Sequence, residues 1–108
     1  MTTRRMTSEA LEEIAERFRA LGEPARLALI EALRDGERTV SDLVLATGQT
    51  QANVSRHLAI LHAAGLVSRR RDGVYVHYVV ADEEVWQLCD LVCDRLLRGA
   101  DAMRRAVG

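Results

Sequence analysis

The stretch TQANVSRHLAILHAAGLVSRRRDGVYVHYVV, residues 50–80, begins with the apolar spacing of a helix and ends with that of a strand. In its first half, apolar residues recur every three or four positions and so share one helix face: Val54, Leu58 and Leu61. Thr50 can cap the start of this helix, and Gly65 is the residue type that commonly ends one. We therefore predict a helix over this half with a buried stripe along one side.

Strand signals fill the second half of the stretch. From Leu66 the period changes to two, because Val67, Arg69 and Arg71 alternate with Ser68 and Arg70. The dipeptide Asp72-Gly73 is typical of a two-residue hairpin turn, and the run VYVHYVV after it is rich in residues that favour strands. The pattern predicts a two-stranded hairpin. An isolated hairpin is only marginally stable, so this one must pack against the helices.

Three helices are expected before this stretch and one after it. Each of the first three has a start signal and a closing glycine, in the pairs Thr7 and Gly22, Pro24 and Gly36, and Thr39 and Gly48. The last helix starts at the acidic run from Asp82 and extends to about Arg98. The expected order is α-α-α-α-β-β-α in a single domain over residues 1–108. The third and fourth helices, joined by a short turn, form a helix-turn-helix.

Positive charge gathers in the middle of the chain. The net charge is -1, but residues 1–49 carry -2, residues 50–78 carry +3 and residues 79–108 carry -2. A basic strip in an otherwise acidic molecule indicates a surface for a polyanion such as the phosphate backbone of a nucleic acid. Charge alone fits a solvated surface equally well.

A helix-turn-helix followed directly by an arginine-lined hairpin favours the nucleic-acid interpretation, because it is the layout of a winged helix. The buried stripe of the fourth helix leaves polar residues to face outward, where they can contact base edges and phosphates of double-stranded DNA. The predicted DNA-binding residues are Thr50, Gln51, Asn53, Ser55, Arg56 and His57 on the helix, and Arg69, Arg70 and Arg71 on the hairpin.

Composition restricts the class of protein further. With 108 residues, 48% of them hydrophobic and 29% charged, the chain is expected to fold as one soluble domain. No window is apolar enough to span a bilayer, and no secretory signal is recognisable, so we expect a cytoplasmic protein with reduced thiols and no membrane partner. There is no glycine-rich phosphate loop and no nucleophile motif, so we do not expect an enzyme.

The last predicted helix is apolar around about two thirds of its circumference, at about 100° per residue. The apolar side chains are Val85, Trp86, Leu88, Cys89, Leu91, Val92, Cys93, Leu96 and Leu97. A helix lying on one core needs a much narrower stripe. The sequence therefore predicts a homodimer, with a partner helix covering the second apolar surface.

The segments FRALGEPARLALIEAL and QANVSRHLAILHAAGLVSRRRDGVYVHYVV resemble the ArsR/SmtB family of winged-helix bacterial transcriptional repressors over about residues 18–82. The resemblance implies a homodimer on an inverted-repeat operator, released when an inducer binds. It also implies that residues 50–64 form the reading helix, that residues 69–80 form the wing, and that the first and last helices build the dimer interface. Half-sites would lie about one helical turn apart, ~34–36 Å.

Several inducer sites of the family have no counterpart in this chain. The cysteine pair that arsenic and cadmium sensors often carry in the third helix is absent from TVSDLVLA. Asp82 matches the first ligand of the zinc sensors, but Glu84, Arg95 and Arg98 occupy the other ligand positions, and arginine cannot bind a cation. The persulfide-type sensors pair a cysteine of the second helix with one of the last, and only the latter exists in this chain.

Cys89 and Cys93 remain as candidate inducer ligands. They lie one turn apart on one face of the last helix, where two thiols could hold a soft metal or metalloid ion or undergo oxidation. No resident cofactor is expected. The alternatives are that both cysteines only pack in the dimer interface and the repressor answers to an unknown ligand, or that the winged helix is a protein-interaction module. An interaction module would not need the positive hairpin.

Overall fold

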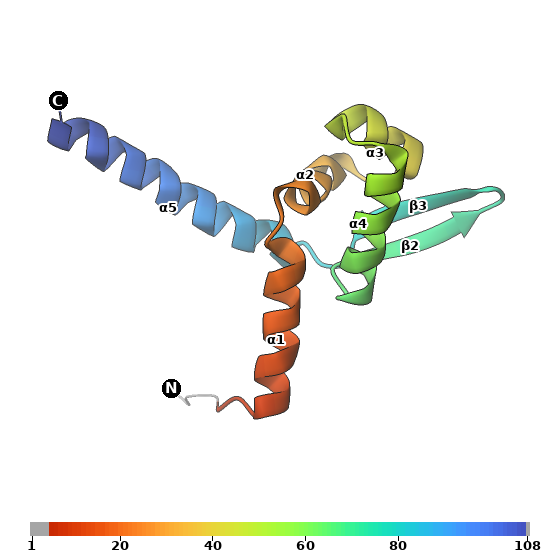
Figure 1. Ribbon diagram of the computed structural model, residues 1–108, viewed down its shortest axis with the longest axis horizontal. Coiled ribbons are helices and arrows are strands. Elements are labelled where there is room, and N and C mark those ends of the chain that lie inside the picture. The colour runs from red at the N-terminus through yellow and green to blue at the C-terminus, as the bar shows by residue number, and fades with distance from the viewer. Residues whose placement is uncertain (1–4, 108) are drawn as a thin grey trace.

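The structure is a computed structural model that describes residues 5–107. Its elements are α1 (Ser8–Leu21), α2 (Pro24–Ala32), the 3-10 turn η1 (Leu33–Asp35), β1 (Arg38–Thr39), α3 (Val40–Thr47), α4 (Gln51–Ala63), β2 (Val67–Asp72), β3 (Tyr75–Val80) and α5 (Glu84–Val107). In Figure 1, α2, α3 and α4 form a cluster from which the β2–β3 hairpin projects, whereas α1 and α5 extend away from that cluster in two other directions.

Local capping signals set the helix starts where the sequence predicts them. Thr39 and Asp42 form a reciprocal capping box: the Thr39 hydroxyl accepts from the Asp42 N–H, and the Asp42 carboxylate accepts from the Thr39 N–H. The Thr50 hydroxyl accepts from the Asn53 N–H at 3.2 Å and so caps α4. Gly48 ends α3 in the left-handed conformation, with a φ of 73° that a side chain would disfavour.

The core lies between α2, α3 and α4. Its fully buried large side chains are Leu29, Ile30, Leu33, Leu43, Val54, Leu58 and Leu61. The predicted apolar stripe of α4 is therefore confirmed as core. Burying a leucine, isoleucine or valine contributes about 1.5–3 kcal/mol each, so these contacts hold α4 firmly with its opposite face in solvent.

The sheet differs from the predicted two-stranded hairpin. It has three strands in the order β1-β3-β2, because Arg38 and Thr39 pair with Tyr78 and His77 of β3. The predicted turn is also wrong by one residue. Asp72 pairs with Tyr75, which leaves Gly73 and Val74 as the two turn residues. Gly73 occupies the first turn position with a φ of 62°, the conformation for which glycine is favoured.

α5 extends well past Arg98, the predicted end, to Val107, and only its first turns are anchored to the core. The indole N–H of Trp86 donates to the carbonyl of Ile30 at 2.9 Å, and Arg34 forms an ion pair with Asp90 at 2.6 Å. No residue of α5 is buried. Its exposed large apolar side chains are Leu88, Leu91, Val92, Leu96, Leu97, Met103 and Val107. Within residues 5–107, no helix is long and apolar enough to cross a membrane.

Candidate nucleic-acid interface

The exposed face of α4 carries most of the polar residues that the sequence assigns to base reading. Gln51, Asn53, Ser55 and Arg56 are all exposed, as is the capping residue Thr50. Arg56 donates to the Asn53 amide oxygen at 3.3 Å, which orders these two side chains beside each other. This surface offers a guanidinium, two amides and a hydroxyl, the groups that hydrogen-bond to base edges and phosphates.

His57 does not belong to this surface, so the prediction that its side chain faces outward is wrong. It is only 5% exposed, and its Nδ1 lies 3.2 Å from a guanidinium nitrogen of Arg26. The reason is helical geometry, since His57 lies three residues after Val54 and four before Leu61, and it therefore shares the buried stripe. Burial lowers the pKa of His57, and the positive charges of Arg56 and Arg26 lower it further.

The three hairpin arginines lie on two faces of the wing. Arg69 and Arg71 share one face with their strand partners Tyr78 and Val76, and the four side chains line a hollow of about 310 Å³. Arg70 points to the other face, where it forms an ion pair and two hydrogen bonds with Glu37. The hydrogen bond from Arg70 lowers the pKa of Glu37, so this carboxylate stays charged at neutral pH.

The three hairpin arginines, which the sequence analysis treats alike, therefore differ in their ion pairing. Among residues 5–107, no carboxylate forms an ion pair with Arg69 or Arg71, whereas Arg70 has Glu37 as a partner and Asp72 within 3.9 Å. Two unpaired guanidinium groups side by side can each take a phosphate. Arg70 would first have to give up its bond to Glu37.

Cys89 and Cys93 lie on the wall of an apolar cavity of about 370 Å³ between α5 and the facing parts of α1 and α2. Cys89 is partly buried and Cys93 is exposed. Burial raises the pKa of the Cys89 thiol, and the carboxylate of Glu31 raises it further, so this thiol is protonated at neutral pH. No group of three or more metal-ligating side chains occurs within residues 5–107. Within these residues, one chain therefore offers a metal ion the thiols of Cys89 and Cys93 without a third ligand beside them.

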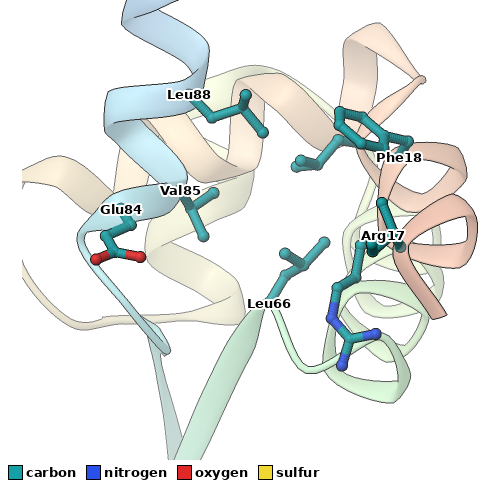
Figure 2. A pocket seen from close by; sticks show the side chains of 8 residues that line it. Arg17, Phe18, Leu66, Glu84, Val85 and Leu88 are labelled. Atoms are coloured by element: carbon teal, nitrogen blue, oxygen red, sulfur yellow. The ribbon is translucent and has the colours of Figure 1, made fainter. Parts of the chain in front are cut away.

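A second cavity of about 290 Å³ continues the first one along α1. In Figure 2, Arg17 and Phe18 of α1 lie opposite Val85 and Leu88 of α5, with Leu66 between them. Both cavities share Phe18, Leu21 and Leu88, so together they form one open apolar groove, which we call the α1–α5 groove.

A helix-turn-helix with a β-hairpin packed beside its second helix defines the winged helix-turn-helix class. Residues 23–69 match the family described as bacterial regulatory protein, arsR family. The transcriptional repressor SmtB of Mycobacterium tuberculosis is 41% identical over 96 residues, which are 88% of this chain and 69% of that repressor. The chain belongs to the ArsR/SmtB family of winged-helix transcriptional repressors, a family of DNA-binding regulators and not of enzymes.

Two further proteins extend this comparison. A probable mercury resistance operon repressor of Streptomyces lividans is 45% identical over 71 residues, 66% of this chain and 57% of that protein. The homodimeric winged helix-turn-helix DNA-binding domain of Mb0332 from Mycobacterium bovis superimposes with a TM-score of 0.77 and 31% identity, covering 92% of this chain and 95% of that domain. The predicted fold class is thus confirmed, with a third strand added to the sheet.

Proposed function

We propose that the protein is a cytoplasmic homodimeric repressor that binds an inverted-repeat operator in double-stranded DNA. The observation that carries this proposal is the exposed polar face of α4 beside the unpaired Arg69 and Arg71 of the wing. In this arrangement α4 enters the major groove, where Arg56 and its neighbours contact base edges. The wing arginines contact phosphates, which supply affinity without sequence preference.

The α1–α5 groove supports the homodimer. Phe18 and Val92, which both line this groove, are more than half exposed, and α5 has no buried residue, so each copy has an apolar surface to cover. A second copy offers a surface of the same kind, as two-fold symmetric interfaces require. The homodimeric domain from Mycobacterium bovis has the same fold, which supports this assembly.

For the inducer we propose a soft metal or metalloid ion, or an oxidant, that acts on Cys89 and Cys93. Both thiols lie in the groove that the second copy covers, so a ligand there contacts the dimer interface directly. Thiolates select soft ions such as Hg²⁺, Cd²⁺ and arsenite. The similarity to a mercury resistance repressor supports this class of inducer. The partial burial of Cys89 favours the alternative, in which the cysteines pack in the interface and the inducer binds elsewhere.

The direct test is selection of DNA from a pool of random-sequence duplexes by the purified protein. We expect an enriched inverted repeat whose half-sites lie about one helical turn apart, ~34–36 Å. We call the duplex obtained in this way the selected operator. Enrichment of no sequence, at low as well as at moderate salt, would contradict the proposed function.

Arg56→Ala tests base reading by α4. We expect it to weaken binding to the selected operator by ~1–3 kcal/mol and to relax the preferred base at one position of each half-site. Fluorescence anisotropy against the operator and a random duplex measures both effects. Arg19→Ala, which removes an exposed arginine from α1, is the matched control and should leave sequence preference unchanged. Equal losses on both duplexes for Arg56→Ala would assign Arg56 to phosphate.

Arg69→Ala and Arg70→Ala test the two faces of the wing. For Arg69→Ala we expect the slope of log Kd against log salt concentration to fall by about 0.9 for each phosphate that the variant no longer neutralises. Arg70→Ala should change the slope less, because its guanidinium is already paired with Glu37. Titrations at four or more salt concentrations measure the slopes. A larger change for Arg70→Ala than for Arg69→Ala would show that the Glu37-facing side of the wing lies against DNA.

A further inference from the structure

One guanidinium group joins three helices beside the middle of α4. Arg26, on α2, donates from Nε to the carbonyl of Ala20 and from Nη2 to the carbonyl of Arg19 at 3.2 Å. Both carbonyls belong to the last turn of α1, where carbonyls lack the regular i+4 partner of a helix interior, although that of Arg19 also accepts from the Gly22 N–H at 3.2 Å. The third contact, from Nη1, reaches Nδ1 of His57 on α4 at 3.2 Å.

The chemistry of the two side chains determines the direction of this third hydrogen bond. Arginine is always protonated and has donors only, so Nδ1 of His57 must be the acceptor. His57 is therefore neutral, with its ring proton on Nε2. The bond is also partly shielded from water, because His57 is only 5% exposed and Arg26 is half-buried. A charge-assisted bond in such a place is stronger and more strictly oriented than one on the surface.

The position of this contact matters because α1 is held to the rest of the molecule mainly at its last turn. Its only buried residues are Ala20 and Leu21, next to the carbonyls that Arg26 binds. The 14 residues of α1 then extend outward, as Figure 1 shows. At 1.5 Å per residue, a helix of this length spans about 20 Å, so a small rotation at its last turn displaces its far end by several ångströms.

From this geometry we propose that Arg26 is a positioning residue for operator recognition, which fixes the angle between α1 and the reading helix α4 through His57. This inference rests on the proposed function, in which α1 and α5 build the dimer interface and α4 reads a half-site. In the dimer, the angle between α1 and α4 contributes to the distance between the two reading helices. Arg26 thus contributes to operator affinity without touching DNA.

Protonation of His57 opposes this contact. An imidazolium has no acceptor at Nδ1, and it would lie beside two positive groups, Arg26 of α2 and Arg56 of α4, with Glu23 at the start of α2 as the opposing charge. Burial and these arginines lower the pKa of His57 in the folded protein below its ordinary value. Between the ordinary pKa of His57 and its lowered pKa in the folded protein, the form in which the Arg26–His57 contact is broken binds more protons. The contact therefore weakens as the pH falls through this range.

The central test compares Arg26→Gln with the parent protein on two probes, the selected operator and a duplex with a single half-site. We expect the affinity of Arg26→Gln for the operator to fall about tenfold or more, the size expected when at least one partly buried hydrogen bond from a charged group is removed. Its affinity for the single half-site should stay within about twofold of the parent, because each α4 still reads its own bases. Equal losses on both probes would overturn the proposal and indicate general destabilisation.

His57→Asn is the second variant, since the asparagine Oδ1 can accept the Arg26 hydrogen bond but does not titrate in the relevant pH range. We expect it to retain operator binding within about threefold at neutral pH, in contrast to the tenfold loss expected on removal of one buried charged hydrogen bond. In acid, below the pH at which the parent loses operator affinity, the variant should lose less. The same acid-induced loss in His57→Asn as in the parent would assign the pH dependence to other groups and contradict the role of His57.

NMR tests the contact without DNA. In the parent protein, the ring nitrogens of His57 should report a proton on Nε2 and none on Nδ1 at neutral pH, and in Arg26→Gln the midpoint of its titration should move upward. Residual dipolar couplings should show a changed angle between α1 and α4 in Arg26→Gln. An unchanged angle would overturn the positioning role, whatever the DNA result. If the parent selects no operator while the angle changes, the proposed function fails and the structural link stands.

Discussion

Leu91→Glu is expected to convert the protein to a monomer and to weaken its binding to the selected operator by about a hundredfold or more. Leu91 is 59% exposed on α5, one turn after the groove residue Leu88, so the substitution borders the groove and leaves the core of each copy intact. In the dimer it would bury a carboxylate against an apolar surface, which is costly for a charge without a partner. Two linked half-sites gain about 10²–10⁴ in affinity from their high effective concentration, and a monomer does not have that gain.

Light scattering at micromolar concentration measures the mass, and anisotropy with the operator measures the affinity. Leu45→Glu is the matched control for the mass, because Leu45 is 85% exposed on α3, outside the α1–α5 groove. It should remain a dimer. A monomeric parent protein, or a dimeric Leu91→Glu that binds the operator like the parent, would contradict the proposed interface.

The helices could be predicted because their signals are local. Thr39 and Asp42 are three residues apart and cap each other, and Thr50 caps α4 by the same short-range bond. The strand β1 gives no such signal. It is two residues long, and its strand character comes from pairing with Tyr78 and His77, almost forty positions later in the chain. A pairing over that distance cannot be recognised from the two residues of β1, although β3 itself has a strand pattern.

The candidate interface also has some features that local spacing predicts and others that depend on residues far apart in the chain. The burial of His57 could have been predicted, because its spacing from Val54 and Leu61 places it on the apolar stripe. Its polar side chain suggested the wrong face. The ion pair of Arg70 with Glu37 could not have been predicted, since the two residues are 33 positions apart and meet only once the sheet has formed. Arg26 was missed for the same reason: its three acceptors belong to two other helices.

A helical wheel predicts the spacing of the two cysteines but not the side chains that surround them. The sequence places Cys89 and Cys93 one turn apart, and the structure confirms a continuous helix over both. The surroundings come from other elements. Glu31 of α2 raises the pKa of Cys89, and Phe18 and Leu27 complete the apolar wall around the thiols. These neighbours leave Cys93 the less buried thiol and make deprotonation of Cys89, which metal binding requires, more costly.

The double variant Cys89→Ser/Cys93→Ser is expected to bind the selected operator as tightly as the parent and to stay bound when a thiophilic agent releases the parent. The probes are HgCl₂, CdCl₂, sodium arsenite and hydrogen peroxide, each added to the preformed complex. In the parent, coupling between inducer and DNA is expected to lower operator affinity about 5–150-fold. The serines conserve shape but provide a hydroxyl that is a poor ligand for soft ions.

The single variants and the pH separate the roles of the two thiols. Cys93→Ser should lose the faster part of the response to peroxide, since Cys93 is the less buried of the two thiols within each copy. Metal binding displaces the Cys89 proton, and burial holds the pKa of that thiol above its ordinary value. The concentration of Cd²⁺ needed for release should therefore fall as the pH rises from 6.5 to 8, by about tenfold per pH unit for each proton displaced. Release of the double variant at the same concentrations as the parent would show that the cysteines only pack in the interface and that the inducer binds elsewhere.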